Sequence, residues 1–116
     1  MDILLIDDEE SILKIMKTLL EKNGYTVKTA KSKSKVLEIL SRENFKIILS
    51  DFLLEDGTGL EILGEFRKRD KTTPFIIITA YGSINGAVEA IKEGANHYIP
   101  KPIDTQNLIK IDNRVL

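Results

Sequence analysis

Short apolar runs alternate along this chain with longer segments in which apolar residues recur every three or four positions. The short runs predict β-strands, and the longer segments predict amphipathic helices. The predicted strands span residues 3–6, 25–29, 47–49, 75–78 and 97–99. The predicted helices span residues 11–22, 32–41, 60–69, 83–93 and 105–115. Strands and helices that alternate in this way indicate an α/β fold with a parallel sheet and helices on both of its faces.

The first predicted helix has one apolar face by helical spacing. That face consists of Ile12, Ile15, Met16, Leu19 and Leu20, which we expect to pack on the sheet. Gly24 follows the helix and predicts its end, because glycine adopts the left-handed conformation without steric cost. Farther along, the glycine-rich segment 55–59 predicts a loop.

Composition narrows the classes of protein that the chain can belong to. The chain has 116 residues, 42% of them hydrophobic, which is enough for one compact domain spanning residues 1–116. Its 17 basic and 18 acidic residues nearly cancel, which gives no support for a nucleic-acid-binding surface. There is no cysteine for a disulfide, and no apolar run approaches the roughly 20 residues of a membrane span. We therefore expect a cytoplasmic protein.

Polar side chains follow four of the predicted strands. Asp7 and Asp8 follow the first strand, Asp51 the third, Thr79 the fourth and Lys101 the fifth. Because the carboxyl ends of parallel strands meet at one edge of the sheet, these residues are expected to share a pocket. Carboxylates at that edge repel one another unless a cation lies between them, and oxygen ligands of this kind suit Mg²⁺.

A lysine and a threonine beside such a metal make a plausible site for a phosphoryl group, and one carboxylate would then be the nucleophile. Taken singly, each residue has a commoner structural role. Asp51 suits a turn, Thr79 the cap of a strand end and Lys101 a solvated loop. Only their combination favours a chemical site.

In this combination the chain resembles the receiver domain of a two-component response regulator over nearly its whole length. The motifs are Ile-Asp-Asp-Glu at 6–9, Leu-Ser-Asp at 49–51, Ile-Thr-Ala at 78–80 and Tyr-Ile-Pro-Lys-Pro at 98–102. Segments 79–83 and 87–90 resemble most closely the nitrogen-regulation-type activators, whose receivers control an ATPase that works with an alternative sigma factor. The resemblance implies a flavodoxin-like, doubly wound, five-stranded parallel sheet with five helices and strand order 2-1-3-4-5.

The resemblance also implies roles for individual residues. Asp51 matches the aspartate that a histidine kinase phosphorylates, and the metal ligands would be Asp7, Asp8, Asp51 and the backbone carbonyl of Phe52. Mg²⁺ is the implied cofactor. The chain would be a regulatory domain that catalyses its own phosphorylation and slow dephosphorylation rather than an enzyme.

Three further residues match the switch of the family. Lys101 would pair with the phosphoryl oxygens, Thr79 would turn toward them, and Tyr98 would become buried when Thr79 moves. The face formed by the fourth helix, fifth strand and fifth helix would then control a homodimer or an output domain. The resemblance implies that ATPase and DNA-binding output domains, where the protein has them, are outside this chain, which could equally be a single-domain regulator. We expect no direct contact of this chain with nucleic acid or membrane.

The sequence departs from the family at three places. Glu55 stands where many members have a proline, so we expect a more mobile segment 52–59. Leu53 cannot orient a water molecule, which predicts slow loss of the phosphoryl group. Asn96 and His97 replace a common aspartate, and we expect that change to be peripheral.

Other classes of function fit less well. A phosphohydrolase with an aspartyl intermediate needs an acid two residues after the nucleophile, where this chain has Leu53. A nucleotide- or flavin-binding module needs a glycine-rich loop after the first strand, where this chain has acids. The remaining alternative is a degenerate receiver that binds partners without being phosphorylated.

Overall fold

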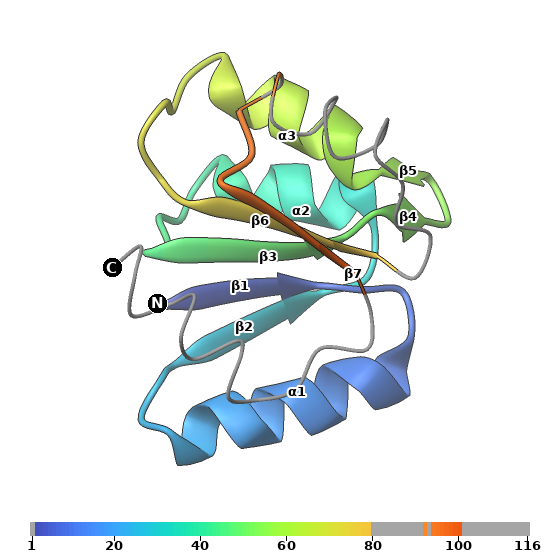
Figure 1. Cartoon of the computed structure of the whole chain (residues 1–116), viewed down its shortest axis with the longest axis vertical. Helices are drawn as coiled ribbons and strands as arrows, with labels where there is room; N and C mark the ends of the chain where they lie inside the picture. The colour runs from blue at the N-terminus through green and yellow to red at the C-terminus, as the bar shows by residue number, and fades with distance from the viewer. Residues whose placement is uncertain (1, 80–91, 93, 101–116) are drawn as a thin grey trace.

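Five parallel strands form the central sheet of the computed structural model, which describes residues 2–79, 92 and 94–100. The strands are β1 (Ile3–Ile6), β2 (Val27–Ala30), β3 (Ile47–Asp51), β6 (Phe75–Thr79) and β7 (His97–Pro100). Their order is β2-β1-β3-β6-β7, which confirms the predicted order 2-1-3-4-5 (Figure 1). The predicted helices at 83–93 and 105–115 lie outside the described residues, apart from the helical Lys92.

Helices cover both faces of the sheet. α1 (Glu10–Lys22) lies on one face, and α2 (Lys33–Leu40) and α3 (Gly59–Arg67) lie on the other (Figure 1). Successive residues of β1 alternate between two cores: Leu4 and Ile6 pack with α2 and α3, whereas Ile3 and Leu5 pack with α1. Because both of its faces are buried, β1 is a continuous apolar run, whereas β2 at the edge of the sheet contains the half-buried Lys28 and Thr29. Within the described part of the chain, no helix is long and apolar enough to cross a membrane.

The predicted buried face of α1 is wrong for two of its five residues, Ile15 and Leu19, which are exposed, whereas Leu20 is buried and Met16 packs against the core. Leu13 and Leu20 are only 4% and 1% exposed and pack against β1 and β3, whereas Ile15 is 61% exposed. Apolar residues occur on two adjacent stripes of this helix, and the spacing within each stripe is helical. Periodicity alone therefore does not set the rotation of the helix about its axis, which depends on its contacts with the sheet.

α2 and α3 begin where a side chain accepts a hydrogen bond from a backbone N–H group of the first turn. Ser32 caps α2 by accepting the N–H of Lys35 at 3.2 Å. Thr58 and Glu61 form a reciprocal capping box at the start of α3. After α1, Gly24 has a φ of +92°, as predicted from its place in the sequence.

The segment after β3 contains more regular secondary structure than the predicted loop. It contains a short antiparallel hairpin of β4 (Leu53–Leu54) and β5 (Gly57–Thr58), joined by Glu55 and Asp56. The hairpin leads directly into α3, so it lies between the end of β3 and the first turn of that helix. The expectation of an irregular loop at 55–59 was therefore wrong for its second half.

Candidate functional site

Two adjacent aspartates follow β1 at the carboxyl edge of the sheet. The N–H of Asp7 donates to the carbonyl of Ala30 at 3.1 Å, which extends the pairing of β1 with β2 by one residue. The carboxylate of Asp7 is 3% exposed and accepts the N–H of Glu9 at 2.9 Å. Asp8 is half-buried. The strand and the start of α1 thus hold the Asp7 carboxylate in place from both sides.

Asp51 is the last residue of β3, the strand next to β1. The register pairs Ile6 with Ser50, so Asp7 and Asp51 follow at equivalent positions of neighbouring strands. The N–H of Phe52 donates to Asp51 Oδ1 at 2.8 Å, which orients that carboxylate. The predicted convergence of these acids follows directly from the strand register.

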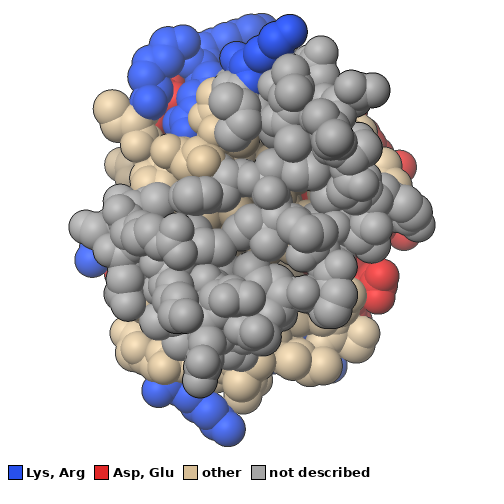
Figure 2. All heavy atoms as spheres, in the orientation of Figure 1, with Lys and Arg blue, Asp and Glu red and all other residues tan. Residues whose placement is uncertain are grey.

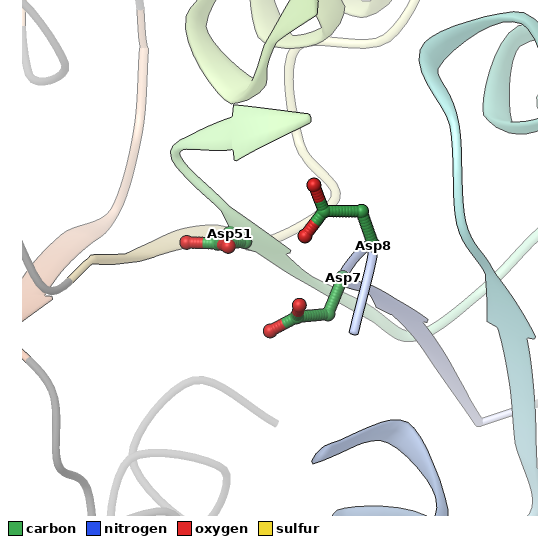
Figure 3. A group of neighbouring side chains, drawn as sticks. All are labelled: Asp7, Asp8 and Asp51. Carbon is green, nitrogen blue, oxygen red and sulfur yellow. The ribbon is translucent and has the colours of Figure 1, made fainter. Parts of the chain in front are cut away.

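The carboxylates of Asp7, Asp8 and Asp51 form one cluster. Each contributes an oxygen, and these oxygens all lie within 4.8 Å of one another. Figure 3 shows the three side chains around one small space, extending from the ends of β1 and β3. Carboxylate oxygens at this spacing repel one another in the absence of a cation and are suitable ligands for a hard divalent ion. The donor set fits such an ion.

The surroundings of the cluster also carry negative charge. Figure 2 shows acidic side chains along the right-hand rim, the side toward which β1 and β3 point in Figure 1. Glu9 and Glu10, which follow the cluster in the sequence, are both exposed. Negative charge on this edge raises the local concentration of cations.

The carbonyl of Phe52 is the predicted fourth ligand. It accepts the N–H of Gly59 at 2.8 Å. A carbonyl oxygen has two lone pairs, so this hydrogen bond leaves room for a metal on the same atom. Gly59 comes this close because it has no side chain: a Cβ there would stand 2.7 Å from the carbonyl oxygen of Asp51.

The other predicted site residues lie at the same edge or beyond the described residues. Thr79 ends β6 and pairs in register with Pro100, the last residue of β7, so its backbone is at the carboxyl edge. Tyr98 lies within β7. The side chains of Thr79 and Tyr98 and the whole of Lys101 are outside the described part of the structure. Their roles therefore stay predictions.

Comparison with known proteins identifies the family. Residues 3–112 match the response regulator receiver domain. The chain belongs to this family. The receiver fold and the regulatory role in two-component signalling that the resemblance implied are thereby confirmed.

Three similar proteins place this receiver more narrowly. It is 36% identical over 106 residues to the transcriptional regulatory protein GlrR of Escherichia coli K12, which covers 91% of this chain and 24% of GlrR. The beryllofluoride-activated NtrC4 receiver domain dimer superposes with a TM-score of 0.90 at 31% identity, covering 98% of this chain and 95% of that one. A response regulator from Burkholderia pseudomallei, solved with a phosphorylated aspartic acid, a calcium ion and citrate, gives a TM-score of 0.88 at 30% identity, covering 93% and 64%.

These similarities confirm the resemblance to receivers of the nitrogen-regulation type. Receivers of response regulators interact with histidine kinases, and they bind a divalent metal at an acidic pocket. The chain spans about a quarter of the length of its curated relative GlrR, so the partners and output of a whole regulator are matters for proposal.

One contact at the start of β7 was not predicted from the sequence. The side-chain carbonyl of Asn96 accepts the N–H of Phe75 at 2.8 Å and a guanidinium N–H of Arg67 at 3.3 Å. Arg67 is only 9% exposed and also donates to the carbonyl of Gly94 at 3.1 Å. The expectation that position 96 is peripheral was therefore wrong, because Asn96 connects the end of α3 to the starts of β6 and β7.

A second missed residue is Asp56, in the turn between β4 and β5. Its two carboxylate oxygens accept the N–H groups of Lys33 and Ser34, at 2.7 and 3.0 Å. The only local signal was an acid before a glycine in a polar segment, which is typical of any turn. The partners lie more than 20 residues earlier in the chain, so local sequence could not have identified them.

Proposed function

We propose that this receiver accepts a phosphoryl group from the phosphohistidine of a histidine kinase onto Asp51. A carboxylate oxygen of Asp51 would form the new bond to phosphorus while the bond from phosphorus to the imidazole nitrogen breaks, leaving the histidine neutral after proton uptake. The observation that carries the proposal is the cluster of carboxylate oxygens within 4.8 Å at the carboxyl edge. The phosphorylated aspartic acid and calcium ion of the Burkholderia pseudomallei relative support the same chemistry.

We assign the metal site to Asp7, Asp8, Asp51 and the carbonyl of Phe52, with Mg²⁺ as the cofactor. The cation, when bound, offsets the repulsion between the carboxylates and the incoming phosphoryl oxygens. Asp7 suits a fixed ligand because its carboxylate is buried and oriented by the Glu9 N–H. The catalysis belongs to the receiver itself, which phosphorylates and slowly dephosphorylates its own aspartate.

Three residues would report that the phosphoryl group has arrived. Lys101 would neutralise phosphoryl oxygens, Thr79 would donate its hydroxyl to them, and Tyr98 would occupy the space that Thr79 leaves. The support is positional, since Thr79 ends β6 and Tyr98 lies in the neighbouring strand β7. A local change in charge would thus shift a two-state surface.

The output follows from the kind of relative that the chain resembles. We propose that residues 1–116 act as a single cytoplasmic receiver domain whose fourth-helix, fifth-strand and fifth-helix face controls a homodimer. That dimer would regulate ATPase and DNA-binding domains outside this chain, and thereby transcription. The transcriptional regulator GlrR and the NtrC4 receiver dimer support this assignment.

Intact-protein mass spectrometry tests the proposal. The protein is incubated with Mg²⁺ and a small-molecule phosphodonor such as acetyl phosphate. We expect the gain of one phosphoryl group in the natural protein and in the matched control Glu9→Gln, and none in Asp51→Asn. The alternative, a receiver that binds partners without phosphorylation, predicts no gain from the donor and no binding of beryllofluoride, and that result would refute the proposal.

A further inference from the structure

The hairpin that follows Asp51 lacks the features that make a short hairpin stable. Its strands pair only through Leu53 with Thr58 and Leu54 with Gly57. Among the described residues, positive φ angles occur only at glycines, so both turn residues, Glu55 and Asp56, have negative φ. Two-residue turns with negative φ angles splay the strands that they join, and a lone two-stranded hairpin is marginal in water. The hairpin therefore depends on contacts with the rest of the domain.

Asp56 provides such a contact with α2. Its carboxylate accepts the N–H of Lys33 at 2.7 Å and that of Ser34 at 3.0 Å. These N–H groups belong to the first turn of α2, where no carbonyl of the helix is available to them. The backbone hydrogen bonds from Ser34 and Lys33 also hold the pKa of Asp56 below its ordinary value. At neutral pH the side chain is thus an anion at the positive end of a helix.

The hairpin also lies very close to α2 and α3. A Cβ at Gly57 would stand 2.6 Å from Cδ of Lys33, so the backbone of β5 lies against that side chain. On the other side, the N–H of Gly59 donates to the carbonyl of Phe52 at 2.8 Å. The hairpin is thus held to α2 through Asp56. Directly after the hairpin, the hydrogen bond from Gly59 fixes the carbonyl of Phe52, the residue next to Asp51.

We infer that Asp56 is a positioning residue for phosphoryl transfer to Asp51. By holding the hairpin on α2, Asp56 keeps the carbonyl of Phe52 in the place where it can serve the metal. The inference rests on the proposed function and adds to it a residue that does not touch the reacting atoms. In many family members a proline at position 55 makes this turn rigid, because proline presets the φ of the first turn residue. In this chain, which has Glu55 there, the contact of Asp56 with α2 would serve the same purpose.

Three variants test the inference. Asp56→Ala removes the contact with α2, Glu55→Ala changes the exposed neighbour as a matched control, and Glu55→Pro combined with Asp56→Ala restores rigidity without the acid. For each protein, calorimetric titration gives the dissociation constant of Mg²⁺, and mass spectrometry gives the rate of phosphorylation by acetyl phosphate at saturating Mg²⁺. Urea unfolding curves confirm that each variant is fully folded under the assay conditions.

We expect Asp56→Ala to weaken Mg²⁺ binding or slow phosphorylation by about tenfold, the lower end of what loss of a group supporting a metal ligand costs. Glu55→Ala leaves both values unchanged, and the double variant recovers most of the loss. A residue that only caps α2 would lower stability and leave the folded protein's rate and affinity intact. If Asp56→Ala does not fold, Asp56→Asn, which keeps a neutral acceptor, takes its place in the same comparison.

Each other result overturns the inference. If Asp56→Ala matches the natural protein in rate and affinity, the contact is only a helix cap. If Asp56→Ala is impaired but proline at 55 restores nothing, the acid acts by some means other than rigidity. If the natural protein itself gains no phosphoryl group, the proposed function fails first, and this inference fails with it. The natural protein is measured alongside the variants, so the two failures are distinguishable.

Discussion

Removing one charge from the acidic cluster should stabilise the metal-free protein. We expect this of Asp8→Asn, which keeps the size of the side chain but removes its repulsion with Asp7 and Asp51. A substitution at a site of this kind usually destabilises a protein. The opposite sign is expected here because the carboxylates are held together by the strand register, at the expense of stability and in favour of cation binding.

The size of the effect follows from the geometry. At the 4.8 Å that bounds the separation of the cluster oxygens, two unit charges repel by about 0.9 kcal/mol in a water-like medium and by about 3.5 kcal/mol at the effective dielectric constant of a protein surface. Asp8 and Asp51 are half-buried, so solvent screens much of the repulsion. For the two pairs that Asp8 makes, we expect a gain of about 2 kcal/mol, which is roughly a 1 M rise in the urea midpoint.

Urea unfolding in EDTA and in excess Mg²⁺ measures both parts of this prediction. In EDTA the variant should be the more stable protein. In excess Mg²⁺ the difference in stability between the two proteins should become smaller or change sign. A ligand at about 100 times its dissociation constant adds about 2.7 kcal/mol to the stability of the natural protein, and it should add much less to the variant, which lacks one ligand. Glu9→Gln is the control, since it removes one charge from the exposed residue next to the cluster.

A lower stability of Asp8→Asn in EDTA would refute the reasoning. It would mean that the Asp8 carboxylate makes favourable contacts in the metal-free protein that exceed its repulsion with the other two acids. Equal stabilisation of both proteins by Mg²⁺ would show that Asp8 is not a ligand, whatever the sign of the first result.

Three further predictions concern other parts of the domain. Gly59→Ala should cost about 1–3 kcal/mol of stability in urea unfolding, because the new Cβ would lie 2.7 Å from the carbonyl oxygen of Asp51; an unchanged midpoint would contradict the close approach. Leu53→Asn should shorten the lifetime of the phosphorylated protein by about tenfold, equivalent to about 1.4 kcal/mol of barrier, as followed by mass spectrometry. Leu53 is 44% exposed, so the domain tolerates the substitution. An unchanged lifetime would contradict the idea that a polar side chain at position 53 orients the attacking water. The hydrogen bond from the N–H of Thr26 is the main cause that lowers the pKa of Asp2 in the folded protein. The charged carboxylate therefore stabilises the fold at neutral pH, and this stabilisation is lost as the pH falls below about 4 and through the lowered pKa. Asp2→Asn should therefore be less stable than the natural protein at pH 7, and the difference in stability should shrink as the pH is lowered below about 4. A difference that does not change with pH would contradict the linkage.

The sequence predicted the sheet and the acidic cluster well because both depend on burial. A strand covered on both faces is mostly apolar, so the run at 47–49 marks the buried part of β3, and the half-buried acid at position 51 marks where the strand leaves the core. Strand order came from the family resemblance, and the register of β1 with β3 then brought Asp7 and Asp51 together. The strand boundaries predicted where each acid lies, and the strand order from the resemblance predicted that the acids meet.

What the sequence did not predict depends on contacts between distant segments. The rotation of α1 is set by which of its apolar stripes fits the sheet, and Ile15 and Leu13 look equally suitable from spacing alone. Asp56 and Asn96 are short polar residues in turns, and each has its partners on another element. Nothing in the local composition distinguishes such residues from ordinary turn formers.

The contacts of Asn96 have a mechanical consequence for β7. Because Arg67 and the N–H of Phe75 hold the residue just before this strand, the start of β7 is a fixed point on the frame of α3 and β6. A displacement that begins beside Thr79 would act on the other end of the strand, at Pro100, which pairs with Thr79 in register. If such a displacement occurs, we expect it to be largest at Pro100 and to decrease toward Asn96, where the start of β7 is held.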